Sequence, residues 1–117
     1  MAKEEQLAIL KQGVKVWNEW REEHPEIRPA LNHADLRELD LRGVNLIDAD
    51  LASANFDSVN LDSAYLIDAN LCSANLASVN LRVVDLTRAD LRGGNLIHAD
   101  LRGTHLNDAL LRGADLR

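Results

Sequence analysis

Leucine recurs at every fifth residue along most of this chain. From Ala34 to Arg117 the period holds for 17 consecutive places, and only Phe56 departs from leucine. A period of five fits neither an α-helix, with its 3.6-residue turn, nor a flat strand, whose side chains alternate every two residues. We predict that these side chains form one inward-facing core, made of Leu36, Leu41, Leu46, Leu51, Phe56, Leu61, Leu66, Leu71, Leu76, Leu81, Leu86, Leu91, Leu96, Leu101, Leu106, Leu111 and Leu116.

The places around each leucine repeat as well. The residue two places before it is small, with Ala at ten places and Val at four, and the residue directly before it is Asn or Asp at 14 of 17 places. The exceptions to Asn or Asp are Tyr65, His105 and Leu110. We interpret each unit as three extended residues followed by a corner. The small residue and the leucine point inward, and the Asn or Asp points outward, where its side chain can hydrogen-bond the backbone of the turn.

Four such units close a square coil of 20 residues, and residues 34–117 provide slightly more than four coils. Stacked coils pair their backbones at the roughly 4.8 Å spacing of neighbouring strands. The pattern therefore predicts an all-β solenoid. Small residues between the leucine layers explain why aromatic residues, at 3% of the chain, are nearly absent.

The units follow the pattern A-(D/N)-L-x-x, as in Ala34-Asp35-Leu36-Arg37-Glu38 and Ala74-Asn75-Leu76-Ala77-Ser78. In this respect residues 34–117 resemble the pentapeptide-repeat family. The resemblance implies a right-handed quadrilateral β-helix of about four coils; the handedness comes from the family and not from the period.

Residues 1–33 follow a different pattern and are predicted to form a helix and a linker. Pro25 should end the helix at or before His24. We expect this helical segment to cap the open edge of the first coil; the alternative is a docking element for another protein. A Trp-Asn-Glu-Trp-Arg helix before the repeats also resembles N-terminal segments of bacterial, notably cyanobacterial, family members. Apolar residues recur at steps of three and four, with Trp20 or Arg21 completing the series: Leu7, Leu10, Val14, Trp17 and Trp20.

The last coil has no such cap in the sequence. We expect it to expose an unpaired backbone edge and to form an end-to-end homodimer with two-fold symmetry. The alternatives are that the chain is a fragment or that its end frays. The predicted dimer surface consists of Leu101, Leu106, Leu110, Leu111 and Leu116.

Composition and motifs narrow the candidate functions. The single cysteine, Cys72, excludes an internal disulfide and favours the cytosol, and no apolar run is long enough to span a membrane. A net charge of −6 argues against nucleic-acid binding. Phosphate-loop, nucleophile-elbow and zinc-site motifs are missing, so we expect no enzyme activity, cofactor, metal or small-molecule substrate. His98 and His105 are expected to be solvated.

The charge is unevenly distributed. Residues 34–79 carry eight acidic residues and two arginines, and residues 80–117 carry five acidic residues and six arginines. Cross-coil ion pairs such as Arg42 with Asp62 are expected. The function that the sequence favours is a non-catalytic module that binds an unknown protein. The alternative, implied only by the family resemblance, is a DNA-mimicking inhibitor or protector of a type II topoisomerase such as gyrase.

Overall fold

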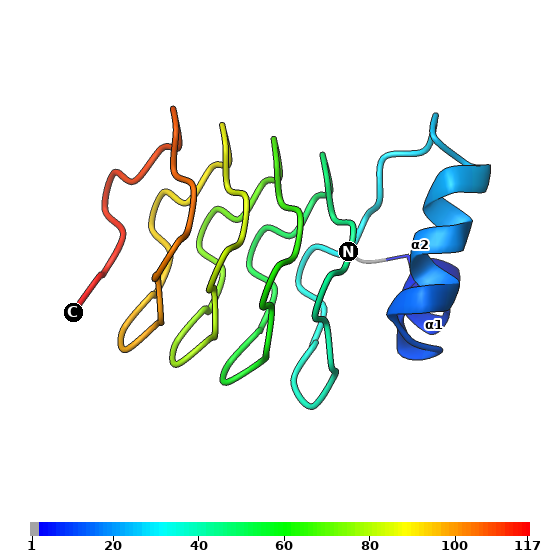
Figure 1. The fold of residues 1–117 in the computed structure, drawn as a ribbon, viewed down its shortest axis with the longest axis horizontal. Helices are drawn as coiled ribbons and strands as arrows, with labels where there is room; N and C mark the ends of the chain where they lie inside the picture. Colours follow the sequence, from blue (N-terminus) through cyan, green and yellow to red (C-terminus); the bar gives the residue numbers. More distant parts are fainter. Residues whose placement is uncertain (1–2) are drawn as a thin grey trace.

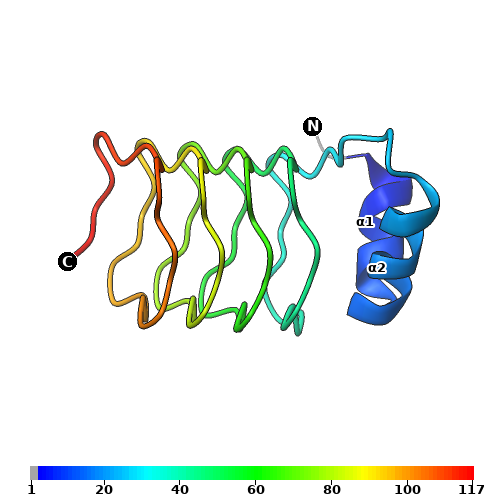
Figure 2. The ribbon, with the colours of Figure 1, turned by 45° about the horizontal axis from the view of Figure 1, so that its top comes forward.

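The computed structural model describes residues 3–117, so the first two residues of the predicted 1–33 segment lie outside the described part of the chain. Two helices, α1 (Glu4–Lys11) and α2 (Val14–Glu23), pack against one end of a stack of coils (Figures 1 and 2). The molecule measures 36 × 26 × 26 Å. Neither helix of residues 3–117 has the length and apolar character needed to cross a bilayer.

The N-terminal segment contains two helices where the sequence pattern predicted one. The break lies at Gln12 and Gly13, and Gly13 has a φ of 112°. That backbone conformation is strained for a residue with a side chain and open to glycine. Leu10 and Trp17 are nevertheless both buried in the common core, because the turn folds α2 back along α1.

The remainder of the chain coils with a period of 20 residues. Parallel bridges join residues 20 apart, from Ala30 with Asp50 to Asn95 with Asp115. Each bridge is isolated, so a side of the coil contributes a single paired residue and the chain then turns. Four five-residue units therefore complete one circuit, as the leucine period predicts.

In the middle of the stack nearly every backbone N–H has a partner, as buried backbone requires. The leucine N–H and the N–H of the second turn residue donate to carbonyls of the next coil, and the Asn or Asp N–H donates to a carbonyl of the preceding coil. The N–H of the small residue closes the turn onto the leucine carbonyl. The first turn residue donates to the side-chain oxygen of the Asn or Asp two places earlier. The five consecutive residues 71–75 show all five bonds: Leu71 to Asp90, Cys72 to Asn70, Ser73 to Arg92, Ala74 to Leu71 and Asn75 to Ala54.

This arrangement explains the choice of Asn or Asp. Each of the 14 Asn and Asp residues at this place accepts the N–H two residues later through Oδ1, at 2.9–3.2 Å. The predicted outward side chain that bonds the turn is thus confirmed. Tyr65, His105 and Leu110 have no oxygen that can do so.

The second turn residue of every unit has a positive φ. The values lie between 58° and 74° from His33 to Gly113. A positive φ at this place, together with the hydrogen bond across the turn, is the requirement of a type II turn. Gly, Ser and Asp fill most of these corners, whereas Val83 is β-branched and unsuited to them.

The core is a continuous column of aliphatic side chains. The leucine-place residues from Leu36 to Leu96, including Phe56, are at most 2% exposed. Leu101, Leu106 and Leu111 are half-buried, and Leu116 is 53% exposed, because no further coil within residues 3–117 covers them.

Candidate interaction surfaces

The edge of the first coil is bonded to side chains of α2. The Trp17 indole N–H donates to the Asn45 carbonyl at 2.8 Å, and the Arg21 guanidinium donates to the Asn45 and Ile47 carbonyls at 3.0 and 2.9 Å. Asn18 Oδ1 accepts the Asn45 N–H at 2.9 Å. Three side chains of one helix thereby hold one side of the first coil.

These bonds replace those that another coil would make. One coil further along, the Tyr65 carbonyl accepts a backbone N–H from Leu46, and the Tyr65 N–H donates to Val44. The Ile67 carbonyl accepts the N–H of Asp48. The side chains of α2 thus satisfy the same three backbone groups as a preceding coil, which is the role expected of a solenoid cap.

The cap also has polar contacts that hydrophobic periodicity does not indicate. Gln6 is buried, and its Oε1 accepts the Ala30 N–H at 2.7 Å. Arg28 Nε donates to the Asp48 carbonyl at 2.8 Å. Burial lowers the pKa of Arg21, while nearby Asp48 acts in the opposite direction. Asn18, Gln6 and Arg28 were not among the predicted cap residues, whose series contained only apolar side chains and Arg21 as an alternative to Trp20.

The predicted apolar cap residues lie as follows. Trp17 and Leu10 are buried, while Leu7, Val14 and Trp20 are half-buried against the same core. The rings of Trp17 and Trp20 lie 5.1 Å apart between centroids.

Most arginines of the coils pair within their own unit. In each Asp-Leu-Arg sequence the Arg side chain turns back onto the Asp two residues earlier, with closest N–O distances of 2.6–2.8 Å. The predicted cross-coil pair of Arg42 with Asp62 is therefore wrong. Arg42 binds Asp40 at 2.6 Å, because the Asp oxygen that accepts the Arg42 N–H already lies beside the start of that side chain. A cross-coil pair does form between Arg88 and Asp68, at 2.7 Å.

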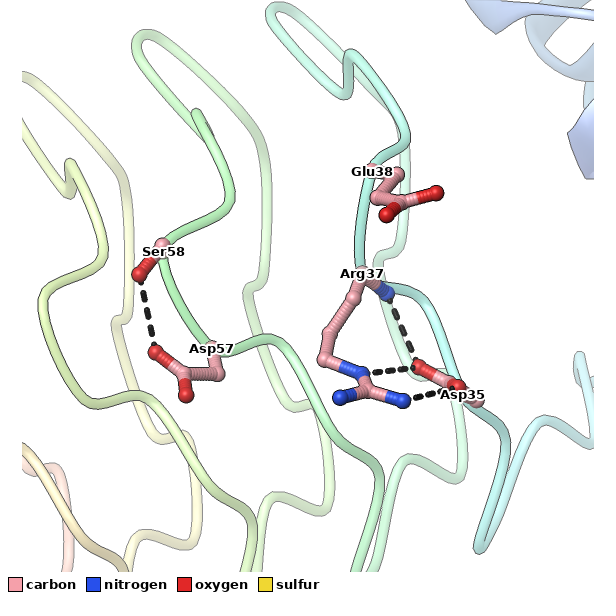
Figure 3. A pocket seen from close by; sticks show the side chains of 5 residues that line it. All are labelled: Asp35, Arg37, Glu38, Asp57 and Ser58. Carbon is pink, nitrogen blue, oxygen red and sulfur yellow. Dashed lines mark hydrogen bonds and ion pairs between the residues drawn. The ribbon is translucent and has the colours of Figure 1, made fainter.

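A hollow of about 430 Å³ lies between the first two coils (Figure 3). Its lining contains the Asp35–Arg37 pair, the carboxylates of Glu38 and Asp57, and Ser58. The hydrogen bond from Arg37 holds the pKa of Asp35 at about 2. Asp57 accepts the Ser58 hydroxyl at 2.9 Å, and the Glu38 carboxylate points away from the other side chains.

The backbone ladder is interrupted at this hollow. At every other corner from His33 to His98 the second turn residue donates its N–H to the next coil, but the bond from Glu38 to Asp57 is missing within residues 3–117. Leu39 follows directly, in a place where other units have a small residue, and its turn bond to Leu36 is stretched to 3.4 Å. A larger side chain at an inward place displaces the corner, since close-packed cores have no spare volume.

The residues with possible chemistry do not form a reactive cluster. His98 and His105 are exposed, and Cys72 is half-buried with its Sγ 3.8 Å from Asp90 Oδ1. Within residues 3–117, no group of three or more His, Cys, Asp or Glu side chains is placed to hold a metal ion. At the end of the stack, Leu110 is 48% exposed beside the partly covered leucines of the predicted dimer surface.

Comparison with known proteins identifies the class of this coil. The model of the pentapeptide-repeat family matches eight copies within residues 30–66, 54–93, 64–103 and 95–117. The chain therefore belongs to the pentapeptide-repeat family. A comparison with curated proteins found no match.

Solved structures agree with this assignment. A pentapeptide repeat protein of the Arabidopsis thaliana thylakoid lumen is 27% identical with a TM-score of 0.72, over 74% of this chain and 61% of that protein. Rfr23 from the cyanobacterium Cyanothece 51142 is 35% identical with a TM-score of 0.64, over 75% of this chain and 65% of that protein. The chain thus matches less than two thirds of the length of either protein.

Proposed function

We propose that this chain is a non-catalytic scaffold that binds another protein through its outward side chains. The observation that carries the proposal is the regular backbone, in which paired coils fix each outward residue at a set place on a flat side. A side of this kind offers extended, preorganised contacts, which lower the entropic cost of binding. The family resemblance implies a right-handed β-helix of about four coils. This β-helix would be the rigid part that holds the binding side chains in place. A cytosolic location, expected from the single Cys72, stays a prediction.

The proposal is tested by capture and reconstitution. The full chain, immobilised and exposed to a lysate of its source organism, should retain one specific protein, which is then purified and titrated by calorimetry. A variant with a disrupted core, Leu76→Asp, serves as the control, because an unpaired charge at a fully buried place should unfold the coil. Failure to retain a protein, or equal binding by the unfolded control, would refute the scaffold function.

The alternative function, inhibition or protection of a type II topoisomerase by DNA mimicry, is supported by the acidic half of the coil. Residues 34–79 carry a net charge of −6, but both arginines of that half neutralise an Asp directly. A supercoiling assay with gyrase tests this alternative. Activity unchanged at a stoichiometric excess of the chain would eliminate it.

An end-to-end homodimer through the last coil of this chain is a further proposal. Leu110 and Leu116 are its most exposed apolar residues. Light scattering at micromolar concentration should give twice the chain mass, and Leu110→Asn, which restores the usual residue of the unit, should weaken the dimer. A monomer under these conditions would contradict the proposal.

A further inference from the structure

Tyr65, like His105 and Leu110, departs from the rule that stabilises the other 14 turns. It occupies the place of Asn or Asp but cannot accept the N–H two residues later, so within the described chain the Ile67 N–H has no partner. The turn at Tyr65 therefore lacks a hydrogen bond that stabilises 14 other turns. The Tyr65 side chain does not compensate by burial, since the residue is 50% exposed.

Val83 departs from a second rule. Its φ of 59° places a β-branched residue in the left-handed region, which is unfavourable for such a side chain. The equivalent residues of the other coils are Gly43, Ser63 and Gly103, all of which tolerate or suit this corner better. Val83 is 59% exposed, so this cost too is not offset by burial in the core.

The two exceptions are neighbours on the surface. Tyr65 is bridged to Asp85 of the next coil, and Val83 precedes Asp85 by two residues on the same run of backbone. The half-buried Ile67 continues the apolar surface from Tyr65 along its own coil. We call Tyr65, Ile67 and Val83 the Tyr65 patch. Sites that violate local rules without a gain in stability are the places where function is expected.

The charges beside the patch indicate the character of the partner. Asp62 and Asp85 flank Tyr65, and neither is in an ion pair with any residue of the described part. Arg82, which precedes Val83 and whose carbonyl accepts the Ser63 N–H, is likewise in no ion pair within residues 3–117. Asp62 accepts the Ser63 hydroxyl, and Asp85 accepts the hydroxyl and the backbone N–H of Thr87, all of which are neutral donors. Tyr65 also lies within residues 34–79, the half of the solenoid that has a net charge of −6. Because acidic residues outnumber arginines by six in this half, a partner that supplies cations beside Tyr65 gains electrostatic complementarity.

We propose that the Tyr65 patch is the docking surface for a protein that inserts apolar side chains between Lys or Arg residues. This inference rests on the proposed scaffold function and places the binding of the partner protein on one side of the solenoid. Tyr65 supplies the kind of large, half-exposed aromatic side chain that dominates binding energy at interfaces.

The test uses a double variant that improves the local structure. Tyr65→Asn and Val83→Ser introduce the residues that other units have at these places, so the coil should fold at least as well as before. Ile97→Ser, which removes a half-buried isoleucine from a different side of the coil, is the matched control. The partner captured in the scaffold experiment is purified and titrated against the wild type and both variants.

We expect at least tenfold weaker binding by the double variant, wild-type affinity for Ile97→Ser, and weaker binding at higher salt. Equal affinity of the double variant and wild type would overturn the patch while leaving the scaffold function intact. Binding that strengthens with salt would overturn the cationic partner, and so would a captured partner that proves to be a second copy of this chain. A wild type that binds no protein would overturn the scaffold function itself.

Discussion

Truncating one leucine tests both the register and the continuity of the core. Leu76 and Leu116 hold the same place in their units and lie in the same column of the stack, yet Leu76 is fully buried and Leu116 is 53% exposed. Leu→Ala at a buried site costs about 2–5 kcal/mol, because a cavity is added to the lost transfer free energy. We expect Leu76→Ala to fall in the upper part of this range, since hydrogen bonds on both edges prevent the coil from collapsing into the cavity.

Leu116→Ala is the matched control and should cost less than about 1 kcal/mol, because much of its side chain is already in water. The measurement is thermal and urea unfolding followed by far-UV circular dichroism. A loss of several kcal/mol should lower Tm by about 10 °C or more in a chain of this size. Equal effects of the two substitutions would refute the assigned register and the burial of the column.

Three further predictions concern the turns, the cap and the charges. Val83→Gly should raise stability by about 1 kcal/mol, and Gly43→Val, at the equivalent corner with a φ of 69°, should lower it by a similar amount in denaturant unfolding. Asn18→Ala should destabilise the chain by about 1–3 kcal/mol and accelerate hydrogen exchange of the Asn45 amide, since both side-chain bonds to the coil are lost; unchanged exchange would contradict the capping role. The hydrogen bonds from Arg102 hold the pKa of Asp100 at about 2, below its unfolded value, so the stabilisation is present above about pH 4 and is lost as the pH falls toward 2. Arg102→Gln should abolish that part of the acid dependence in a pH series of melting curves.

The sequence predicts the coil better than its ends because the coil repeats one solution. A period of five with small, Asn or Asp, and Leu in fixed order leaves few backbones that bury the leucine. The predicted outward and inward places are observed at Asn70 and Leu71: the Asn70 side chain accepts a hydrogen bond from the turn, and the Leu71 side chain is buried in the core. Handedness is the exception, since the period is the same for either hand and only the family resemblance provides it.

The cap was predicted less completely because its polar contacts have no periodicity. Asn18 and Arg21 bind backbone carbonyls and an N–H that become available only when the first coil has formed. The two-helix geometry had a local signal in Gly13, which the apolar pattern running through it obscured. The ion pair of Arg42 was also hard to predict, because both Asp40 and Asp62 lay within reach of its side chain. Arg42 pairs with Asp40, which is only two residues away along the chain.

The distribution of Asp-Leu-Arg units changes the meaning of the charge asymmetry. These units lie in the first coil and again from Asp90 onward, and none occurs between Asn45 and Asp85. Because each Arg of these units neutralises its own Asp, Asp57 and Asp62 are among the acidic residues of the described part that are left without an ion pair, and they lie on the same coil. This coil also carries Tyr65, so the acidic charge and the exposed aromatic residue together favour a cationic partner at this part of the surface.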